Sequence, residues 1–229
     1  MPPRVDPVAT LNALFDAERA ARAAHDALVE ADAGRLMPLL DAAAREALGL
    51  MEKDEDEASL RLARIAGVLG ELEGPRAVDL LVDILASEAP EARQAAGEAL
   101  SGLSFDRFKE VALGVERALE RLPEGSPALA ELPYLLAEVP EPGVARLLAR
   151  FLAHKDADAV AAAIETLVEM GDPGAVALLR PLSADKRHVQ LEDEGGTEAD
   201  ATIGELAAEA CEILEGDGGR AGAPGRAAP

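Results

Sequence analysis

The chain has 229 residues, 49% of them hydrophobic, and a formal net charge of -22 from 22 Lys and Arg against 44 Asp and Glu. This length and apolar content suffice for one domain with a continuous core. The negative charge excludes nucleic acid and anionic membranes as expected partners, because both are bound through Lys and Arg that approach phosphates. No stretch of about 18 uncharged apolar residues is present, so we expect no transmembrane helix.

The composition favours helices throughout. Trp is absent, and there are only four Phe and one Tyr, so the core must be built from Leu, Val, Ile and Ala. Ala, Leu, Glu and Arg are all good helix formers. The single cysteine cannot form an internal disulfide, and the first residues lack the apolar stretch of a signal peptide, so we expect a cytoplasmic protein. Heavy use of Ala, Gly, Arg and Pro indicates a bacterial coding bias.

The first predicted helix covers residues 7–31, with Asp6 as its N-cap and Pro7 at its first position. Its large apolar residues share one helical stripe: Leu11, Leu14, Phe15, Ala21 and Leu28. We predict that residues 1–34 form an N-terminal capping helix.

Two further helices are predicted within residues 35–72, as a degenerate repeat. The first runs from about residue 36 to residue 50. The second follows the acidic run 52–57 and ends near Gly70. The apolar faces of the two helices are predicted from three- and four-residue spacing: Leu36, Leu39, Leu40, Ala43, Ala47 and Leu50, then Leu60, Ile65, Val68 and Leu69.

A proline followed five and six residues later by a Leu pair occurs three times along the chain. The three segments are Pro75 to Leu81, Pro142 to Leu148 and Pro173 to Leu179. Because the prolines lie 67 and 31 residues apart, the unit is about 31 to 34 residues long with one degenerate copy, a period typical of stacked helical hairpins. We therefore predict repeats at 75–104, 105–140, 142–171 and 173–215, within one domain spanning 1–215.

The segment 75–103, PRAVDLLVDILASEAPEARQAAGEALSGL, resembles a HEAT repeat of the phycobilisome-lyase-like type. The resemblance implies large aliphatic residues on the first helix, alanines on the second, and an arginine near the start of the second helix that caps it or bridges to the next repeat. Arg93 occupies that place, whereas Val160 replaces it in repeat 142–171. The implied fold is all-α: a right-handed α-solenoid of stacked HEAT-like helical hairpins.

Proline or glycine residues change the structure that we expect for two of the later repeats. In repeat 105–140, we expect separate helices at 105–122 and 126–139, the second kinked or restarted at Pro133. In repeat 173–215, Val189 and Leu191 alternate with polar residues before a Gly-Gly pair, which predicts a small β-hairpin insert between helices.

Thr202 and Glu205 have capping-box spacing and predict the start of the last helix. Residues 216–229 are predicted to be a disordered tail, because they are rich in Gly, Ala and Pro. The β-hairpin has two open interpretations: a cover for the end of the solenoid, or an element that docks a partner across residues 187–200.

Catalytic machinery is not visible in the sequence. His25, His154 and His188 fall on different elements, and Cys211 lies late in a helix among glutamates, which disfavours a reactive thiolate. The acidic runs 52–57 and 192–194 lack the ligand order of a calcium loop and are interpreted as solvated loops. We assign no catalytic, cofactor-binding or metal-binding residue.

The leading hypothesis is a non-enzymatic scaffold that binds a partner protein along the second helices of its repeats. The candidate contact positions are exposed polar residues: Arg61, Arg64, Glu91, Gln94, Glu98, Glu165 and Glu169. Two alternatives stay open. One is a lyase or isomerase, which the family resemblance implies. The other is an acidic inhibitor or immunity-type protein that covers a basic surface. We expect a monomer or a weak homodimer without a cofactor.

Overall fold

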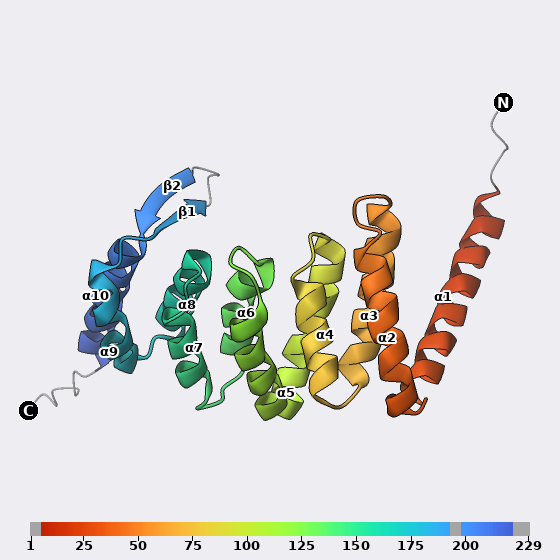
Figure 1. The fold of residues 1–229 in the computed structure, drawn as a ribbon, viewed down its shortest axis with the longest axis horizontal. Helices are drawn as coiled ribbons and strands as arrows, with labels where there is room; N and C mark the ends of the chain where they lie inside the picture. The colour runs from red at the N-terminus through yellow and green to blue at the C-terminus, as the bar shows by residue number, and fades with distance from the viewer. Residues whose placement is uncertain (1–5, 193–197, 222–229) are drawn as a thin grey trace, which may run out of the picture.

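The computed structural model describes residues 6–192 and 198–221, in which helices follow one another along an elongated stack (Figure 1). The helices are α1 (Pro7–Val29), α2 (Ala33–Leu48), α3 (Glu55–Glu71), α4 (Pro75–Leu85), α5 (Pro90–Arg121), α6 (Pro127–Ala137), α7 (Val144–Leu152), α8 (Ala157–Met170), α9 (Val176–Leu179) and α10 (Ile203–Ala221). Short 3-10 turns at Pro173–Ala175 and Arg180–Ala184 flank α9, and a hairpin of β1 (His188–Glu192) and β2 (Glu198–Thr202) precedes α10. Among these residues, no helix combines the length and apolar character that a membrane crossing needs.

The helices form two rows, as an α-solenoid requires. One row, the first-helix row, contains α2, α4, the C-terminal half of α5, α7 and α9. The other, the second-helix row, contains α3, the N-terminal half of α5, α6, α8 and α10. The all-α solenoid fold with a β-hairpin insert is therefore confirmed.

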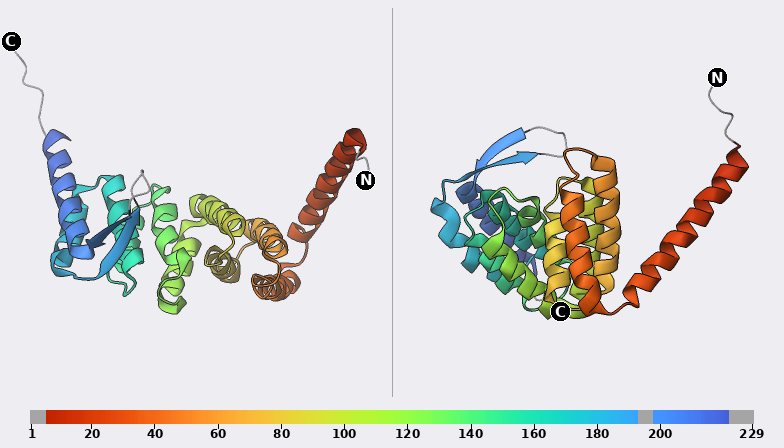
Figure 2. Two further views of the ribbon diagram at one scale, coloured as in Figure 1. Left: turned by 90° about the horizontal axis from the view of Figure 1, so that it is seen from above. Right: turned by 45° about the vertical axis from the view of Figure 1, so that its right-hand side comes forward.

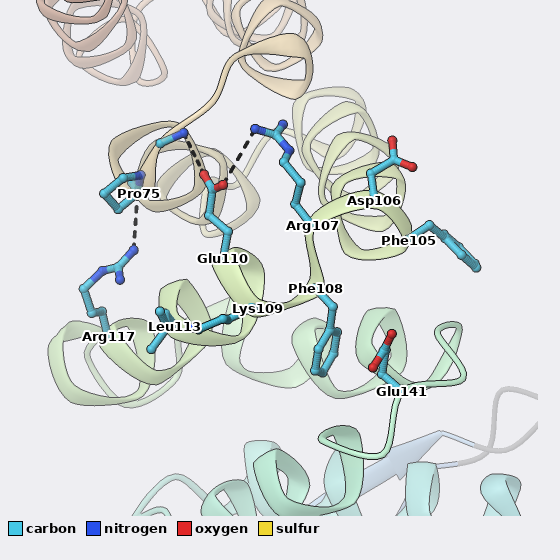
Figure 3. A pocket seen from close by; sticks show the side chains of 11 residues that line it. Pro75, Phe105, Asp106, Arg107, Phe108, Lys109, Glu110, Leu113, Arg117 and Glu141 are labelled. Carbon is cyan, nitrogen blue, oxygen red and sulfur yellow. Dashed lines mark hydrogen bonds and ion pairs between the residues drawn. The ribbon is translucent and has the colours of Figure 1, made fainter.

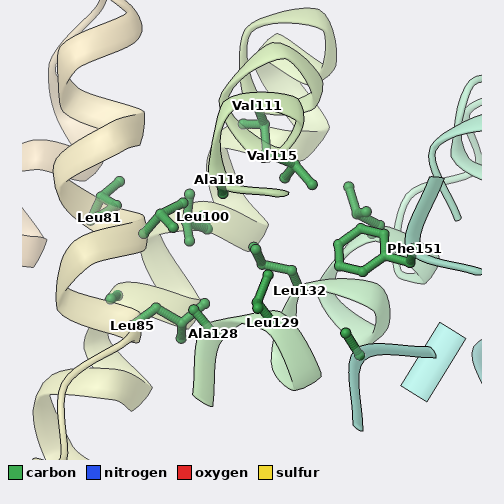
Figure 4. Close-up of a cluster of buried hydrophobic side chains, with 14 of the residues drawn as sticks. Leu81, Leu85, Leu100, Val111, Val115, Ala118, Ala128, Leu129, Leu132 and Phe151 are labelled. Carbon is green, nitrogen blue, oxygen red and sulfur yellow. The ribbon is translucent and has the colours of Figure 1, made fainter. Parts of the chain in front are cut away.

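A continuous apolar strip runs between the two rows. Leu80, Leu81, Leu147 and Leu148 are all buried, so the Leu pairs of the first two proline segments occupy equivalent places. The third pair differs, because Leu178 is 36% exposed. Figure 4 shows part of this strip: Leu81, Leu85, Leu100, Val111, Val115, Ala118, Ala128, Leu129, Leu132 and Phe151. Each hairpin buries its apolar side against its neighbours, so stability is shared along the stack.

Helix α5 contains the two helices predicted on either side of residue 105, but they meet at a kink and no loop separates them. The chain passes from one repeat to the next through a kink at Arg107 (φ -139°, ψ 45°) with no intervening loop. No proline or adjacent glycine pair occurs here to stop the helix. The Arg107 guanidinium instead donates two hydrogen bonds of 3.0 Å to the Leu72 carbonyl, which fixes the kink against the α3–α4 turn.

Helix α1 covers the N-terminal end of the stack less completely than predicted. Asp6 caps it as expected, but α1 has no buried residue and leans away from its neighbours (Figure 2). Its main link is the hydrogen bond between His25 Nε2 and Glu71 Oε1, at 2.7 Å. The terminal pair α2–α3 therefore keeps apolar surface in solvent, and Leu39 (66% exposed) and Leu60 (52% exposed) are not the core residues that their spacing predicted.

Prolines act differently in two predicted helices. Helix α6 runs unbroken through Pro133, which is buried, so the expected restart does not occur. The first helix expected in repeat 173–215 is instead a 3-10 turn, one α-helical turn and a second 3-10 turn that contains Pro181. Pro181 lacks the amide hydrogen that a continuing α-helix needs.

The C-terminal predictions are largely confirmed. The strands β1 and β2 pair antiparallel, and the predicted Gly195-Gly196 turn lies outside the described residues. Thr202 and Glu205 form the capping box: the Thr202 amide donates to Glu205 Oε2 at 2.8 Å, and the Glu205 amide donates to Thr202 Oγ1 at 3.2 Å. Helix α10 continues to Ala221, beyond the predicted end at Gly216, because a glycine weakens a helix by only about 1 kcal/mol and does not stop it. Residues 222–229 lie outside the described residues.

Candidate functional site

Ion pairs join successive repeats along the first-helix row. Arg117 reaches back to Asp79 (Nη2 to Oδ1, 2.8 Å), and Arg150 reaches back to Glu116 (Nη1 to Oε1, 2.8 Å). The pairs Arg121 with Asp83 and Arg76 with Asp41 follow the same pattern. In each pair an arginine of one repeat neutralises an acid of the repeat before it. The acids on this row are therefore used by the fold itself.

Asp41 shows the electrostatic effect of this arrangement. Its carboxylate accepts a hydrogen bond from Arg45, which is the largest cause of a lowered pKa at Asp41. Partial burial opposes this effect, and the Arg76 guanidinium reinforces it. The ionised form of Asp41 is thus stabilised by two cations, one from its own helix and one from the next repeat.

The second helices from α5 to α8 contain few basic residues, so most of their acids have no ion-pair partner within the described part of the chain. Across the N-terminal half of α5, α6 and α8, Arg93 is the single Lys or Arg. It pairs with Glu131 on α6, with Nη2 2.6 Å from Oε1, which confirms that Arg93 bridges to the next repeat. The remaining exposed acids of these elements make no ion pair within the described part of the chain: Glu91, Glu98, Asp106, Glu138, Asp158, Glu165 and Glu169. We call the exposed side of α3, this half of α5, α6 and α8 the second-helix face.

A hollow of about 700 Å³ lies on this face between α3 and α5. Its floor is made of small residues: Gly67, Gly70, Ala95, Ala99 and Gly102. The two helices approach closely, since a Cβ atom added at Gly70 would lie 3.0 Å from the Ala99 Cβ. Four acidic side chains also line the hollow, namely Glu71, which binds His25, and Glu73, Glu98 and Asp106. Arg107 lines it as well, and its guanidinium is bonded to the Leu72 carbonyl. Small residues thus open a groove whose rim is negative.

A second hollow of about 430 Å³ continues the groove between α5 and α6. Glu98 lines both hollows, and Glu131, Leu135 and Glu138 line the second one from α6. The Ser101 hydroxyl donates to the Glu138 carboxylate and holds it across the two helices. Arg93 also lines this second hollow, where its charge is paired with Glu131, so Glu98 and Glu138 carry net negative charge from the first hollow into the second.

Tyr134, the only tyrosine, extends the face from α6 to α8. Its hydroxyl donates to Glu165 Oε2 at 2.5 Å. Burial is the main cause of a raised Tyr134 pKa, followed by the hydrogen bond to Glu165 and the charges of Glu165 and Glu169. Tyr134 thus remains neutral and fixes the Glu165 carboxylate without cancelling its charge.

Another hollow, of about 660 Å³, lies on the opposite side of Arg107, at the kink of α5 (Figure 3). Two of its charged groups hold the chain turn: Glu110 Oε1 accepts from the Gly74 amide at 2.7 Å, and Arg117 Nη2 donates to the Pro75 carbonyl at 3.3 Å. Phe105 points away from these groups and is 60% exposed. The hollow contains no nucleophile next to a general base.

The histidines and the cysteine have structural surroundings. His154 Nδ1 accepts from the Asp156 amide and its Nε2 lies 3.2 Å from the Leu119 carbonyl, while His188 Nδ1 lies 2.9 Å from Asp200 Oδ2. Burial raises the pKa of the Cys211 thiol, and Glu215 raises it further. Within residues 6–192 and 198–221, no group of three or more His, Cys, Asp or Glu side chains is arranged to hold a metal ion. The predicted acidic run 192–194 falls mostly outside these residues.

The seven candidate contact positions all lie exposed on second helices. Arg61 is taken up by ion pairs with Glu57 and Glu46, at 2.7 and 2.9 Å, so it is less available to a partner. Glu98, Glu165 and Glu169 are brought onto the face described above. Sequence analysis missed Tyr134 and Glu138, although Glu131, Tyr134 and Glu138 follow the i, i+3, i+7 spacing of one helix side.

The β-hairpin is attached to the end of the stack. Val189 is 3% exposed, and Arg187 Nη1 donates to the carbonyls of His154 and Lys155 at 2.7 and 3.0 Å. Arg187 also pairs with Asp185 and lowers the pKa of that carboxyl. These contacts favour the cover interpretation over the docking interpretation.

No protein-family model and no curated protein sequence matches this chain. Two engineered proteins solved by the Northeast Structural Genomics Consortium align with 86% of the chain and with 90% and 91% of their own, at 18% and 20% identity and TM-scores of 0.32 and 0.33. A designed armadillo repeat protein aligns with 83% of the chain and 98% of its own, at 15% identity and a TM-score of 0.30. The fold assignment above rests on the helix arrangement itself.

Proposed function

We propose that the protein is a non-enzymatic interaction scaffold that binds a partner protein on its second-helix face. The observation that carries this proposal is that the two helix rows differ in whether their acidic residues are paired. Acids of the first-helix row pair with arginines of the next repeat. On the second-helix face, Glu73, Glu98 and Glu138 line a groove and make no ion pair within the described residues. One row thus holds the repeats together, and the other is left for recognition.

The shape of the fold supports the same assignment. A solenoid presents a surface that extends over several repeats, which suits an elongated protein partner better than a small substrate. The groove is open, and its unpaired carboxylates, Glu73, Glu98 and Glu138, come from separate elements of the stack. Enzyme sites instead gather a few convergent groups in one concave pocket.

The finer family assignment is part of the proposal. We propose that the repeats are of the HEAT type and that the protein acts in the cytoplasm. Support comes from the proline at the start of α4, the alanine-rich second helix and the inter-repeat contact of Arg93 with Glu131. An exposed acidic surface without an ion-pairing partner also agrees with a protein ligand and disfavours nucleic acid.

A matched pair of glycine substitutions tests the scaffold. Gly102 and Gly216 are both exposed on helices, and an added Cβ at either meets no atom within 4 Å. Gly102→Trp fills the groove, whereas Gly216→Trp places the same side chain on α10. In affinity capture from native lysate followed by mass spectrometry, the wild type and Gly216→Trp are expected to retain the same partner and Gly102→Trp to lose it. Equal capture by both variants would place the partner elsewhere, and no stoichiometric partner would contradict the scaffold.

A further inference from the structure

We infer that the second-helix face takes an extended, Lys- and Arg-rich segment of the partner, laid across α3, α5, α6 and α8. This inference rests on the proposed function and names the chemistry of the partner. The occupant is a polypeptide with spaced cations, since the recognition groups are carboxylates on successive helices.

The carboxylates occur in steps along the stack. Glu73 follows α3 and Glu98 lies on α5, around one hollow; Glu138 follows α6 and Glu165 lies on α8. Packed helices are about 10 Å apart, and an extended chain in the polyproline II conformation rises about 3.1 Å per residue with about three residues per turn, so every third side chain lies on one side. A cation at about every third residue of the bound segment therefore matches one carboxylate step per helix.

The groove floor suits the stems of such cations. Gly67, Gly70, Ala99 and Gly102 leave the backbone of α3 and α5 accessible, and the partly buried Leu135 lines the next hollow. Lys and Arg place their methylene stems on apolar surface and keep their charged ends in solvent, near carboxylates. The methylene stem of a Lys or Arg thus lies on the floor of the groove, and its charged end pairs with a carboxylate at the rim.

Other occupants fit the face less well. A compact metal ion needs ligands gathered within one site, whereas these carboxylates lie on separate helices and form no such group among the described residues. A second copy of the chain carries the same net charge of -22 and is repelled. A segment with spaced cations satisfies acids that lie too far apart for one small ion.

The first test compares two synthetic peptides of about a dozen residues with identical composition. One has Lys at every third position, and the other has its lysines contiguous. Binding is measured by anisotropy of the dye-labelled peptides at low and moderate salt. We expect the spaced peptide to bind the full-length protein at least about fivefold more tightly, a difference that general attraction to an acidic protein does not produce. Equal affinities, or no binding at low salt, would overturn the inference.

The second test separates the face from the overall charge. Variant one carries Glu98→Gln, Glu138→Gln, Glu165→Gln and Glu169→Gln. The matched control carries Asp26→Asn, Glu30→Gln, Glu52→Gln and Glu88→Gln, exposed acids outside the second-helix face and without ion pairs within the described residues. Both sets raise the formal charge equally. We expect the first set to weaken binding of the spaced peptide at least about tenfold and the control less than about twofold.

Equal weakening by both sets would show attraction by net charge alone and would overturn the basic-segment site. The capture experiment remains independent of this result. If Gly102→Trp abolishes capture while the peptide tests fail, the scaffold stands and the partner chemistry assigned here is wrong. If capture fails as well, the scaffold itself is contradicted.

Discussion

Tyr134 donates its hydroxyl hydrogen to Glu165 Oε2 at 2.5 Å, joining α6 to α8 across 31 residues of sequence. The pair sits on the second-helix face, next to Glu169 and in the same row as the groove. Because the chain has no Trp and only one Tyr, any optical signal from tyrosine reports on this position. The pair therefore offers a direct probe of the candidate binding surface.

The Tyr134 phenol should ionise at a higher pH than a free tyrosine, near 10, because burial and then Glu165 raise its pKa. A folded pKa above the unfolded one means that this contribution to stability is present below about pH 10 and is lost as the pH rises toward the folded value. Absorbance at 295 nm across an alkaline titration measures it. Glu165→Gln should lower the pKa but leave it above that of the denatured chain, because burial remains; ionisation at the free value in the wild type contradicts the contact.

Two glycines of α5 should respond to alanine in opposite directions. Gly114→Ala would place a Cβ 2.3 Å from Val78 Cγ1 on α4, so the helices must separate, and we expect a loss of about 1–3 kcal/mol. Gly102→Ala meets no atom within 4 Å and should gain up to about 1 kcal/mol from helix propensity. Thermal unfolding followed by circular dichroism compares them. The same sign for both variants would contradict the packing described between α4 and α5.

Asp156 links the turn before α6 to the first turn of α8. It is 5% exposed, and its carboxylate accepts from the Gly125 amide at 2.6 Å and from the Ala159 amide at 3.1 Å. Asp156→Ala leaves both donors without this acceptor and should cost about 2–4 kcal/mol in urea unfolding. Asp158→Asn is the control: desolvation and then the Asp156 charge raise the pKa of Asp158, so removing its charge should change stability by less than about 0.5 kcal/mol. Comparable losses would show that Asp156 has no special role.

The two interpretations of the β-hairpin predict different effects of replacing residues 187–200 by a short glycine linker. Since Val189 is buried and Arg187 holds the α7–α8 turn, we expect a lower melting temperature with binding of the lysine-spaced peptide retained. Melting curves and peptide anisotropy on the same protein distinguish the cases. An unchanged melting temperature with lost binding would favour docking by the hairpin.

Sequence periodicity predicted the helices well because each one carries its own signal. Pro75, Pro90 and Pro127 begin helices, and Asp6 caps α1. A boundary between two helices near residue 105 was predicted, but the direct kink at Arg107 was not, since Arg107 is held by the Leu72 carbonyl of the preceding repeat. Helix propensity describes one segment at a time, whereas this turn depends on two.

The exposure of apolar residues at the N-terminal end was also not predictable from spacing. Leu60 belongs to a regular apolar pattern, but α3 lies in the terminal helix pair. Helix α1 does not cover this pair closely, and a hollow of about 440 Å³ remains between α1 and α3. The candidate surface was predicted in part: Glu98 and Glu165 were identified from their helices. Tyr134 was missed because a lone tyrosine in an apolar helix has no motif, and its partner Glu165 is distant in sequence.

In the proposed scaffold, the first-helix row holds the repeats together and the second-helix face binds the partner. Amide chemical shifts of the isotope-labelled protein, followed during titration with the lysine-spaced peptide, test it residue by residue. The expected result is a set of shifts confined to α3, the N-terminal half of α5, α6 and α8, with α2, α4 and α7 unchanged. Shifts centred on the first-helix row, or spread evenly over both rows, would contradict it.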